Sequence, residues 1–256
     1  MGTDFTYAEN VLTFTSGGEY TVTMIDRVTF TTADRIVVSA SGDITLTLSS
    51  INVTSSTASP LEVNTTSAVT ILLSGTNVLT STASGYAGLQ KTSTDNTLTI
   101  TSANGDGSTD GSLTATGGTS GAGIGGGADS DGSNITISGG TVKATGGAGN
   151  YGGAGIGGGG GSTAAGSGTN ITIEGGTVTA NGGGATTTEG SNISVVVYGG
   201  AGIGGGGSTA GGSGTDITIT GGTVAATGGG TAEAVSSSGT AYGFGYGGAG
   251  IGGGGG

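Results

Sequence analysis

The sequence predicts an all-β protein, a right-handed, single-stranded parallel β-helix of about seven turns with three short strands in each turn. Two observations lead to this prediction. The motif ITIxGGTV occurs at Ile135, Ile171 and Ile217, and weaker copies begin at Ile44, Val69 and Leu98. Within each copy, apolar residues alternate with polar residues or glycine, which is the period of a strand that buries one face.

The repeats also predict where the chain leaves the helix. Residues 1–19 are expected to form an N-terminal cap with the first strands, and residues 20–256 the repeat array. Repeats that are longer than the shortest turn must place their extra residues in loops at the corners. We expect such insertions at 102–111, 182–198 and 228–247, with the last two forming one lobe.

Aligning the repeats predicts columns of side chains that point into the core. On the first strand these are Ile44, Val69, Leu98, Ile135, Ile171 and Ile217, and then Leu46, Ile71, Ile100, Ile137, Ile173 and Ile219. On the second strand the alignment places Thr76 between Ile51 and Leu113, and Val78 between Val53 and Ala115. On the third strand it places Ala87 beside Leu61, and Leu89 beside Val63.

Glycine occupies the outward positions of the third strand in the later repeats, at Gly123, Gly155, Gly202 and Gly250. Because only glycine lets a second layer of backbone approach closely, these positions predict a bare packing face that also narrows the core. We expect this face and the segment Gly248–Gly256 to pack against a neighbouring chain. The alternative is that the glycines serve only tight corners.

Oxygen-bearing side chains are concentrated in one loop. Asn104, Asp106, Ser108 and Asp110 stand at alternate positions, and Asp129 and Asp131 follow about one turn later. Hard oxygen ligands in a glycine-rich loop suit Ca²⁺, so a calcium site is a hypothesis for this loop. Turn formation by solvated Asp and Asn is the competing explanation.

Tyr151, Tyr198 and Tyr246 each stand three residues before the alanine of a third strand, with Tyr242 and Phe244 beside the last of them. We expect the three tyrosines to stack in successive turns, where they could bind a sugar ring or pack only on each other. A column of outward threonines on the first strand, at Thr45, Thr70, Thr99, Thr136, Thr172 and Thr218, adds a minor alternative, ice binding.

Composition excludes several classes of function. The net charge of −12 argues against a nucleic-acid surface. The chain contains no His and no Cys, so an imidazole base and a thiolate nucleophile are absent and no enzyme is expected. No apolar segment is long enough to predict a transmembrane helix.

The segments GSLTATGGTSGAGIGGG, ITISGGTVKATGG and GGAGIGGGG resemble the repeats of large surface proteins of anaerobic, often gut, bacteria. They also resemble β-helix carbohydrate-binding domains that bind acidic plant polysaccharide and calcium. The resemblance implies an extracellular, non-enzymatic module for adhesion or binding of a polysaccharide or cell-surface glycan. The alternative is a self-associating fibre or surface-layer subunit. An acidic polysaccharide would need bridging cations such as Ca²⁺, because the chain itself is acidic.

Overall fold

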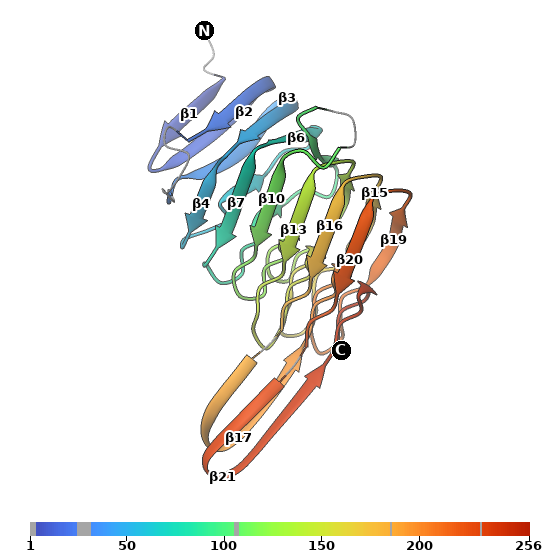
Figure 1. Ribbon diagram of the computed structural model, residues 1–256. Helices are drawn as coiled ribbons and strands as arrows, with labels where there is room; N and C mark the ends of the chain where they lie inside the picture. The colour runs from blue at the N-terminus through green and yellow to red at the C-terminus, as the bar shows by residue number, and fades with distance from the viewer. Residues whose placement is uncertain (1–3, 25–31, 105–107, 185, 231) are drawn as a thin grey trace.

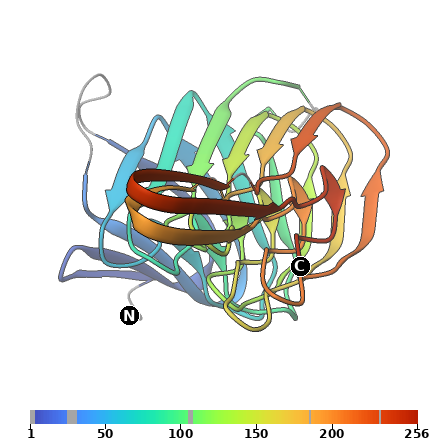
Figure 2. The ribbon, with the colours of Figure 1, turned by 90° about the horizontal axis from the view of Figure 1, so that it is seen from below.

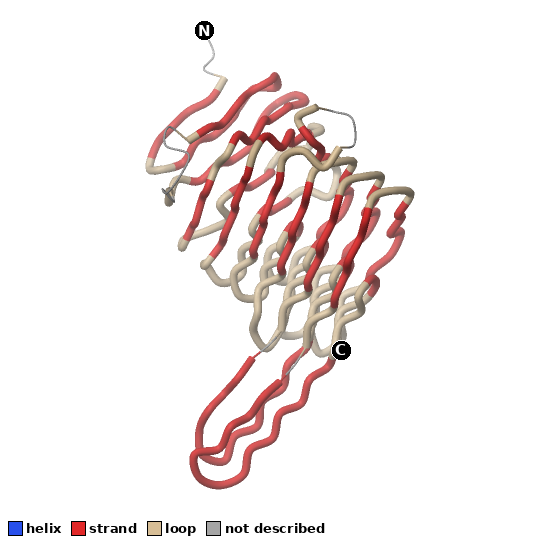
Figure 3. Tube along the Cα trace, viewed as in Figure 1, coloured by secondary structure: helices blue, strands red, loops and turns tan. Residues whose placement is uncertain are grey.

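The computed structural model describes residues 4–24, 32–104, 108–184, 186–230 and 232–256. Within this part of the chain every regular element is a β-strand. The strands form a 14-stranded sheet, a six-stranded sheet and a separate two-stranded sheet, and the two large sheets enclose one core in a nearly closed, barrel-like arrangement (Figures 1 and 3). The fold is therefore all-β with large parallel sheets. No helix among the described residues is long and apolar enough to span a membrane.

Each repeat contributes one strand to each of three parallel stacks. The first stack contains β3 (Arg35–Ser49), β6 (Val69–Ser74), β9 (Leu98–Ser102), β12 (Gly132–Ile137), β15 (Gly168–Ile173) and β19 (Gly214–Ile219). The second contains β4 (Asn52–Ser55), β7 (Thr76–Ser81), β10 (Ser112–Thr116), β13 (Thr141–Thr145), β16 (Thr177–Asn181) and β20 (Thr223–Thr227). The third contains β5 (Leu61–Val63), β8 (Leu89–Lys91), β11 (Ile124–Gly125), β14 (Ile156–Gly157), β18 (Ile203–Gly204) and β22 (Ile251–Gly252).

The long strand β3 joins the first and third stacks into one sheet. Its first half pairs with β5 through Ile36 and Leu61, and its second half pairs with β6 through Ile44 and Val69. At the N-terminal end, β2 (Val11–Thr23) pairs in parallel with β3, and β1 (Phe5–Ala8) pairs antiparallel with β2. Strand β2 runs without a break through the boundary expected at 19/20.

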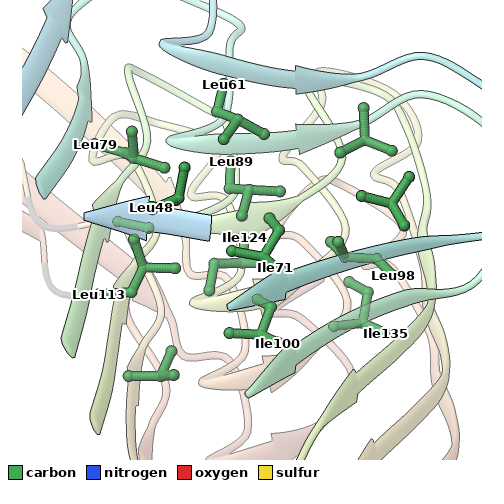
Figure 4. Close-up of a cluster of buried hydrophobic side chains, with 14 of the residues drawn as sticks. Leu48, Leu61, Ile71, Leu79, Leu89, Leu98, Ile100, Leu113, Ile124 and Ile135 are labelled. Atoms are coloured by element: carbon green, nitrogen blue, oxygen red, sulfur yellow. The ribbon is translucent and has the colours of Figure 1, made fainter. Parts of the chain in front are cut away.

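The predicted columns of the first stack are confirmed by the strand register. Ile44, Val69, Leu98, Ile135, Ile171 and Ile217 are successive partners, and Leu46, Ile71, Ile100, Ile137, Ile173 and Ile219 are the next column. Figure 4 shows side chains of the three stacks meeting in the interior, with Leu61, Leu89 and Ile124 in one row. Burial of these apolar side chains, at about 1.5–3 kcal/mol each, is the main force that holds the stacks together.

The prediction for β7 was wrong by one residue. Asn77 and Leu79 face the core, with neither side chain exposed, and Thr76 and Val78 face outward. Asn77 accepts a hydrogen bond from the Ile51 amide at 3.1 Å and donates to the carbonyl of Ser112 at 3.0 Å. The amide therefore satisfies buried backbone groups of both neighbouring strands, which is why a polar side chain is tolerated there. An apolar-only pattern cannot identify such a position.

The prediction for the third stack was wrong by two residues at its first member, β5. Leu61 pairs with Leu89, not with Ala87, and Val63 pairs with Lys91. From β8 onward the column is as expected, with Leu89, Ile124, Ile156, Ile203 and Ile251 as successive partners. The shift places the ammonium-bearing side chain of Lys91 in the interior, where it is 2% exposed.

The glycine face also differs from the expectation. Gly123, Gly155 and Gly202 are buried, and Gly250 is half-buried. A Cβ on Gly202 would lie 2.5 Å from the carbonyl oxygen of Gly250 and 2.6 Å from the amide nitrogen of Thr227, two atoms of the chain's own next repeat. A second layer of backbone does approach these glycines, but the same chain supplies it. The face is therefore not available to a neighbouring chain.

The last repeat leaves one side of the stacks open. Strands β19, β20 and β22 stand at the ends of the sheet orders and pair on one side only. Ile219 and Ile251 are 43% and 47% exposed, although their partners Ile173 and Ile203 are completely buried. The end of the core at this repeat is an apolar surface bordered by unpaired backbone groups.

Candidate functional site

The two long insertions of the later repeats lie side by side. Strands β17 (Thr186–Tyr198) and β21 (Ala232–Tyr246) form the two-stranded parallel sheet, which we call the lobe. The lobe projects away from the stacked strands in Figure 1, and Figure 2 shows its two strands one above the other. Both insertions leave at the same corner in successive repeats, so their backbones come into pairing distance.

Three tyrosines stack where the lobe joins the core. The ring centroids of Tyr151 and Tyr198 are 5.7 Å apart with planes at 5°, and those of Tyr198 and Tyr246 are 5.0 Å apart at 11°. Parallel strands at about 4.8 Å hold successive rings at this separation. The predicted stacking is confirmed. The inner ring, Tyr198, has a neighbour on both faces, whereas Tyr246 ends the row.

The edge strand of the lobe presents a row of exposed aromatic rings. Tyr242, Phe244 and Tyr246 alternate along β21, so they share one face of the strand, and they are 57%, 51% and 45% exposed. The rings of Tyr242 and Phe244 are stacked with centroids 6.4 Å apart. On the neighbouring strand, Val195 and Val197 point to the opposite face, where both are buried. The aromatic row is therefore the solvent side of the lobe.

The acidic loop is only partly assembled as expected. Asn104 Nδ2 donates to Asp110 Oδ2 at 2.9 Å, and the Ser108 hydroxyl donates to the hydroxyl of Ser102 at 3.1 Å. Asp106 lies outside the described residues. Asn104 thus presents an amide N–H, not a ligand oxygen, to the carboxylate of Asp110. A calcium site in this loop stays a prediction.

Asp129 and Asp131 do not join that loop. Asp131 precedes β12, whereas Asn104 follows β9, and these strands pair in parallel with Ile100 opposite Ile137. The two groups therefore lie at opposite ends of the first stack. Asp131 instead accepts a hydrogen bond from the amide of Ser167 at 2.7 Å. Among the described residues, no three His, Cys, Asp or Glu side chains gather closely enough to hold a metal ion.

A polar group lies inside the core between β8 and β9, where the sequence pattern gives no sign of it. Lys91 Nζ donates to the carbonyl of Ser93, and burial lowers the pKa of Lys91 to about 8, although Asp95 nearby acts in the opposite direction. Asn96 is 2% exposed and its amide has no partner among the described residues. These groups face a closed interior, so we assign them no ligand.

A cavity of about 380 Å³ opens at the N-terminal end of the core. Its lining is mostly apolar and includes Leu12, Val22 and Met24. Tyr7 donates to Asp34 at 3.1 Å at its rim, and this hydrogen bond raises the pKa of Tyr7. The lining includes Met24 and Thr32, between which the sequence is not described, and we assign the cavity no function.

Comparison of the chain with protein-family models, with curated proteins and with solved structures finds no match. The lobe is the most distinctive feature of the surface, because it combines exposed aromatic rings with a strand edge. The geometry of the lobe itself is therefore the basis for proposing a site.

Proposed function

We infer that the stacked sheets are a right-handed, single-stranded parallel β-helix of about seven turns with three strands per turn. The chain passes through the three stacks in the same order in each repeat, from β6 to β7 to β8 and then on to β9. Connections between parallel strands of one sheet are right-handed in about 98% of cases, which supports the hand.

We propose that the protein is a non-enzymatic, extracellular module of the bacterial surface that binds a polysaccharide or cell-surface glycan through the lobe. The carrying observation is the row formed by Tyr242, Phe244 and Tyr246, with about half of each residue in solvent. Exposed aromatic rings in a row are costly to leave in water, and such patches mark binding surfaces.

The row suits a sugar chain for a geometric reason. Side chains two residues apart on a strand are about 6.6 Å apart, so alternate rings support successive positions along an extended ligand. The electron-rich face of each ring attracts the weakly positive C–H groups of a pyranose. Because the protein has a net charge of −12, an acidic polysaccharide requires cations between the two surfaces.

Removing two of the three rings of the aromatic row is expected to abolish binding to polysaccharide. The variant Tyr242→Ala/Phe244→Ala should elute from immobilised plant and bacterial polysaccharides without delay, while the parent protein is retained by at least one of them. Affinity columns run with calcium and with chelator measure this, and a requirement for calcium identifies the acidic class.

The matched control is Tyr86→Ala, because Tyr86 is a 37% exposed tyrosine outside the lobe. It should be retained like the parent protein. Parent protein that passes every column unretained, or a double variant that is retained as well as the parent, contradicts the proposal. Circular dichroism of each variant separates a lost contact from a lost fold.

A second candidate function, self-association into fibres or a surface layer, is favoured by the open repeat at β19, β20 and β22. Unpaired strand edges recruit further strands, and the exposed Ile219 and Ile251 add apolar area. In this alternative the segment Gly248–Gly256 contacts a second chain. The buried glycines Gly155 and Gly202 take no part.

Charging the open repeat is expected to keep the chain monomeric. The parent chain should associate with rising concentration, and Ile219→Lys/Ile251→Lys should sediment as a monomer over the same range. Analytical ultracentrifugation measures this, with Tyr242→Ala/Phe244→Ala as a control that should associate like the parent. A parent protein that is monomeric throughout excludes assembly through this end and leaves the polysaccharide proposal unaffected.

A further inference from the structure

The second stack carries a surface that the sequence analysis did not identify. The outward side chains of β4, β7, β10, β13, β16 and β20 form what we call the threonine face, which is turned toward the viewer in Figure 1. The strand register aligns one edge column as Thr76, Ser112, Thr141, Thr177 and Thr223. Every member of this column carries a hydroxyl group.

A second hydroxyl column runs parallel to the first. It contains Thr80, Thr116, Thr145, Asn181 and Thr227, so four of its five members are threonine. The column between them is mixed and holds Val78, Thr114, Lys143, Thr179 and Ala225. The observed register of β7, one residue away from the predicted one, matters here. It turns Thr76 and Thr80 outward and so completes both edge columns.

The face carries almost no charge, although the chain as a whole is acidic. The whole chain has 16 acidic residues, but none of them is an outward residue of these six strands. No aromatic side chain stands there either, and Lys143 is the one charged residue. The face therefore lacks the charged and aromatic side chains that usually bind an ion or a protein surface. The hydroxyl lattice itself is what the face offers to a ligand.

The spacing of that lattice favours bound water. Within each column, hydroxyls of neighbouring strands are about 4.8 Å apart, and the two columns stand four residues, about 13 Å, apart along the strands. Neighbouring hydroxyls are thus too far apart for a direct hydrogen bond, which needs about 2.8 Å, but one water between them can bond to both. Within the described part of the chain, Thr141 is the one threonine of the two columns whose side-chain hydroxyl donates to another residue, at 3.2 Å to the carbonyl oxygen of Thr109.

We propose that the threonine face orders water into a regular layer and binds ice through it. Each hydroxyl donates one hydrogen bond and accepts two, so a column of hydroxyls fixes a row of waters, and the methyl groups between them confine the waters to those rows. An array repeated over five strands presents the growing ice crystal with waters that are already in fixed positions. This activity is independent of the lobe and of the polysaccharide proposal.

Ice-affinity partitioning tests the proposal directly. A dilute solution is frozen slowly on a cold finger, and the protein in the ice is compared with the protein left in the liquid. The parent protein should enter the ice, and Thr116→Lys/Thr145→Lys should be excluded from it, because two long side chains then stand on adjacent strands of the face. The variant Lys143→Thr should raise thermal hysteresis, since it extends the hydroxyl array into the middle column.

The matched control is Thr99→Lys/Thr136→Lys, which changes the same residue types and the same net charge on adjacent strands of the first stack. This variant should enter the ice like the parent. Exclusion of the parent protein overturns the proposal, and so does a loss confined to the control variant, which would assign the activity to the first stack. Melting curves confirm that each variant is folded at the temperature of the assay.

Discussion

Replacing Gly157 by alanine should prevent the protein from folding to its native stability. Gly157 has a φ of 132°, a region that residues with a Cβ rarely adopt, and its added methyl group would overlap the carbonyl oxygen of Gly204 in the next repeat. Backbone cannot move aside as the end of a side chain can. We expect a loss of at least about 4 kcal/mol, the range reserved for such severe changes. Denaturant unfolding measures it.

The control for this prediction is Gly247→Ala. A Cβ on Gly247 has its nearest neighbour at 3.7 Å, the carbonyl oxygen of Gly229, which is an ordinary contact. The variant should unfold within about 0.5 kcal/mol of the parent, as for surface substitutions in general. Equal stability of Gly157→Ala and the parent would show that the close stacking of these glycines is not required.

Replacing Lys91 by methionine should stabilise the protein. The pKa of Lys91 falls from 10.5 in the unfolded chain to about 8 in the folded one, because burial disfavours the charged ammonium. At pH 7 this shift costs the folded state about 3 kcal/mol. Methionine has a similar length and no charge, although it loses the hydrogen bond to Ser93. We therefore expect a net gain of about 2 kcal/mol in the free energy of unfolding at pH 7.

The same substitution should remove a pH dependence. The folded state releases the Lys91 proton before the unfolded state does, so the parent protein should gain stability as pH rises from about 8 to 10.5. Below pH 8, Lys91 is charged in both states, and the full destabilisation by its burial remains. Lys91→Met should show no such rise, and Lys143→Met, at an exposed lysine, should keep it. Urea unfolding at several pH values distinguishes the three proteins. If Lys91→Met is less stable than the parent protein, the interior contacts of Lys91 outweigh the cost of burying its charge, and the prediction is wrong.

The sequence was sufficient for the strands that repeat most strictly. In the first stack, Ile135, Ile171 and Ile217 share the ITI motif, and their alignment by motif equals their pairing in the sheets. The stacking of Tyr151, Tyr198 and Tyr246 could be predicted in the same way, because each stands at the same position in its repeat. Where the motif holds, the distance in sequence fixes the register, because one residue of slip would turn every buried side chain outward.

The sequence was insufficient where a polar residue replaces an apolar one in the core. Asn77 and Lys91 both point inward, and an alignment that avoids buried polar groups shifts the strand to exclude each of them. What makes Asn77 acceptable is a pair of backbone partners, Ile51 just before β4 and Ser112 on β10, which are brought close only by folding. The prediction that the glycine face packs against a neighbouring chain was wrong for a related reason. The sequence shows where backbone without side chains occurs, but not which segment covers it.

The threonine face was missed because of that error at β7. With Thr76 assigned to the core, the edge column of hydroxyls is interrupted at its second strand. When Asn77 is placed in the core, Thr76 faces outward and the edge column is continuous. A scan for TxxxT in the second strand of each repeat, as in TVKAT at 141–145 and TVAAT at 223–227, would have found most of the array without the structure.

The narrowing of one core column bears on how the chain assembles during synthesis. The inward column of the second stack contains Val53 and Leu79 in the early repeats, and then Ala115, Ala144, Ala180 and Ala226. In a linear array, stability is a sum of couplings between neighbouring repeats, and larger apolar side chains strengthen each coupling. The repeats that leave the ribosome first are thus the most strongly coupled, and each later repeat docks on a template that is already complete. Unfolding of these repeats should run in reverse, beginning among the alanine-containing repeats and proceeding toward those that contain Val53 and Leu79.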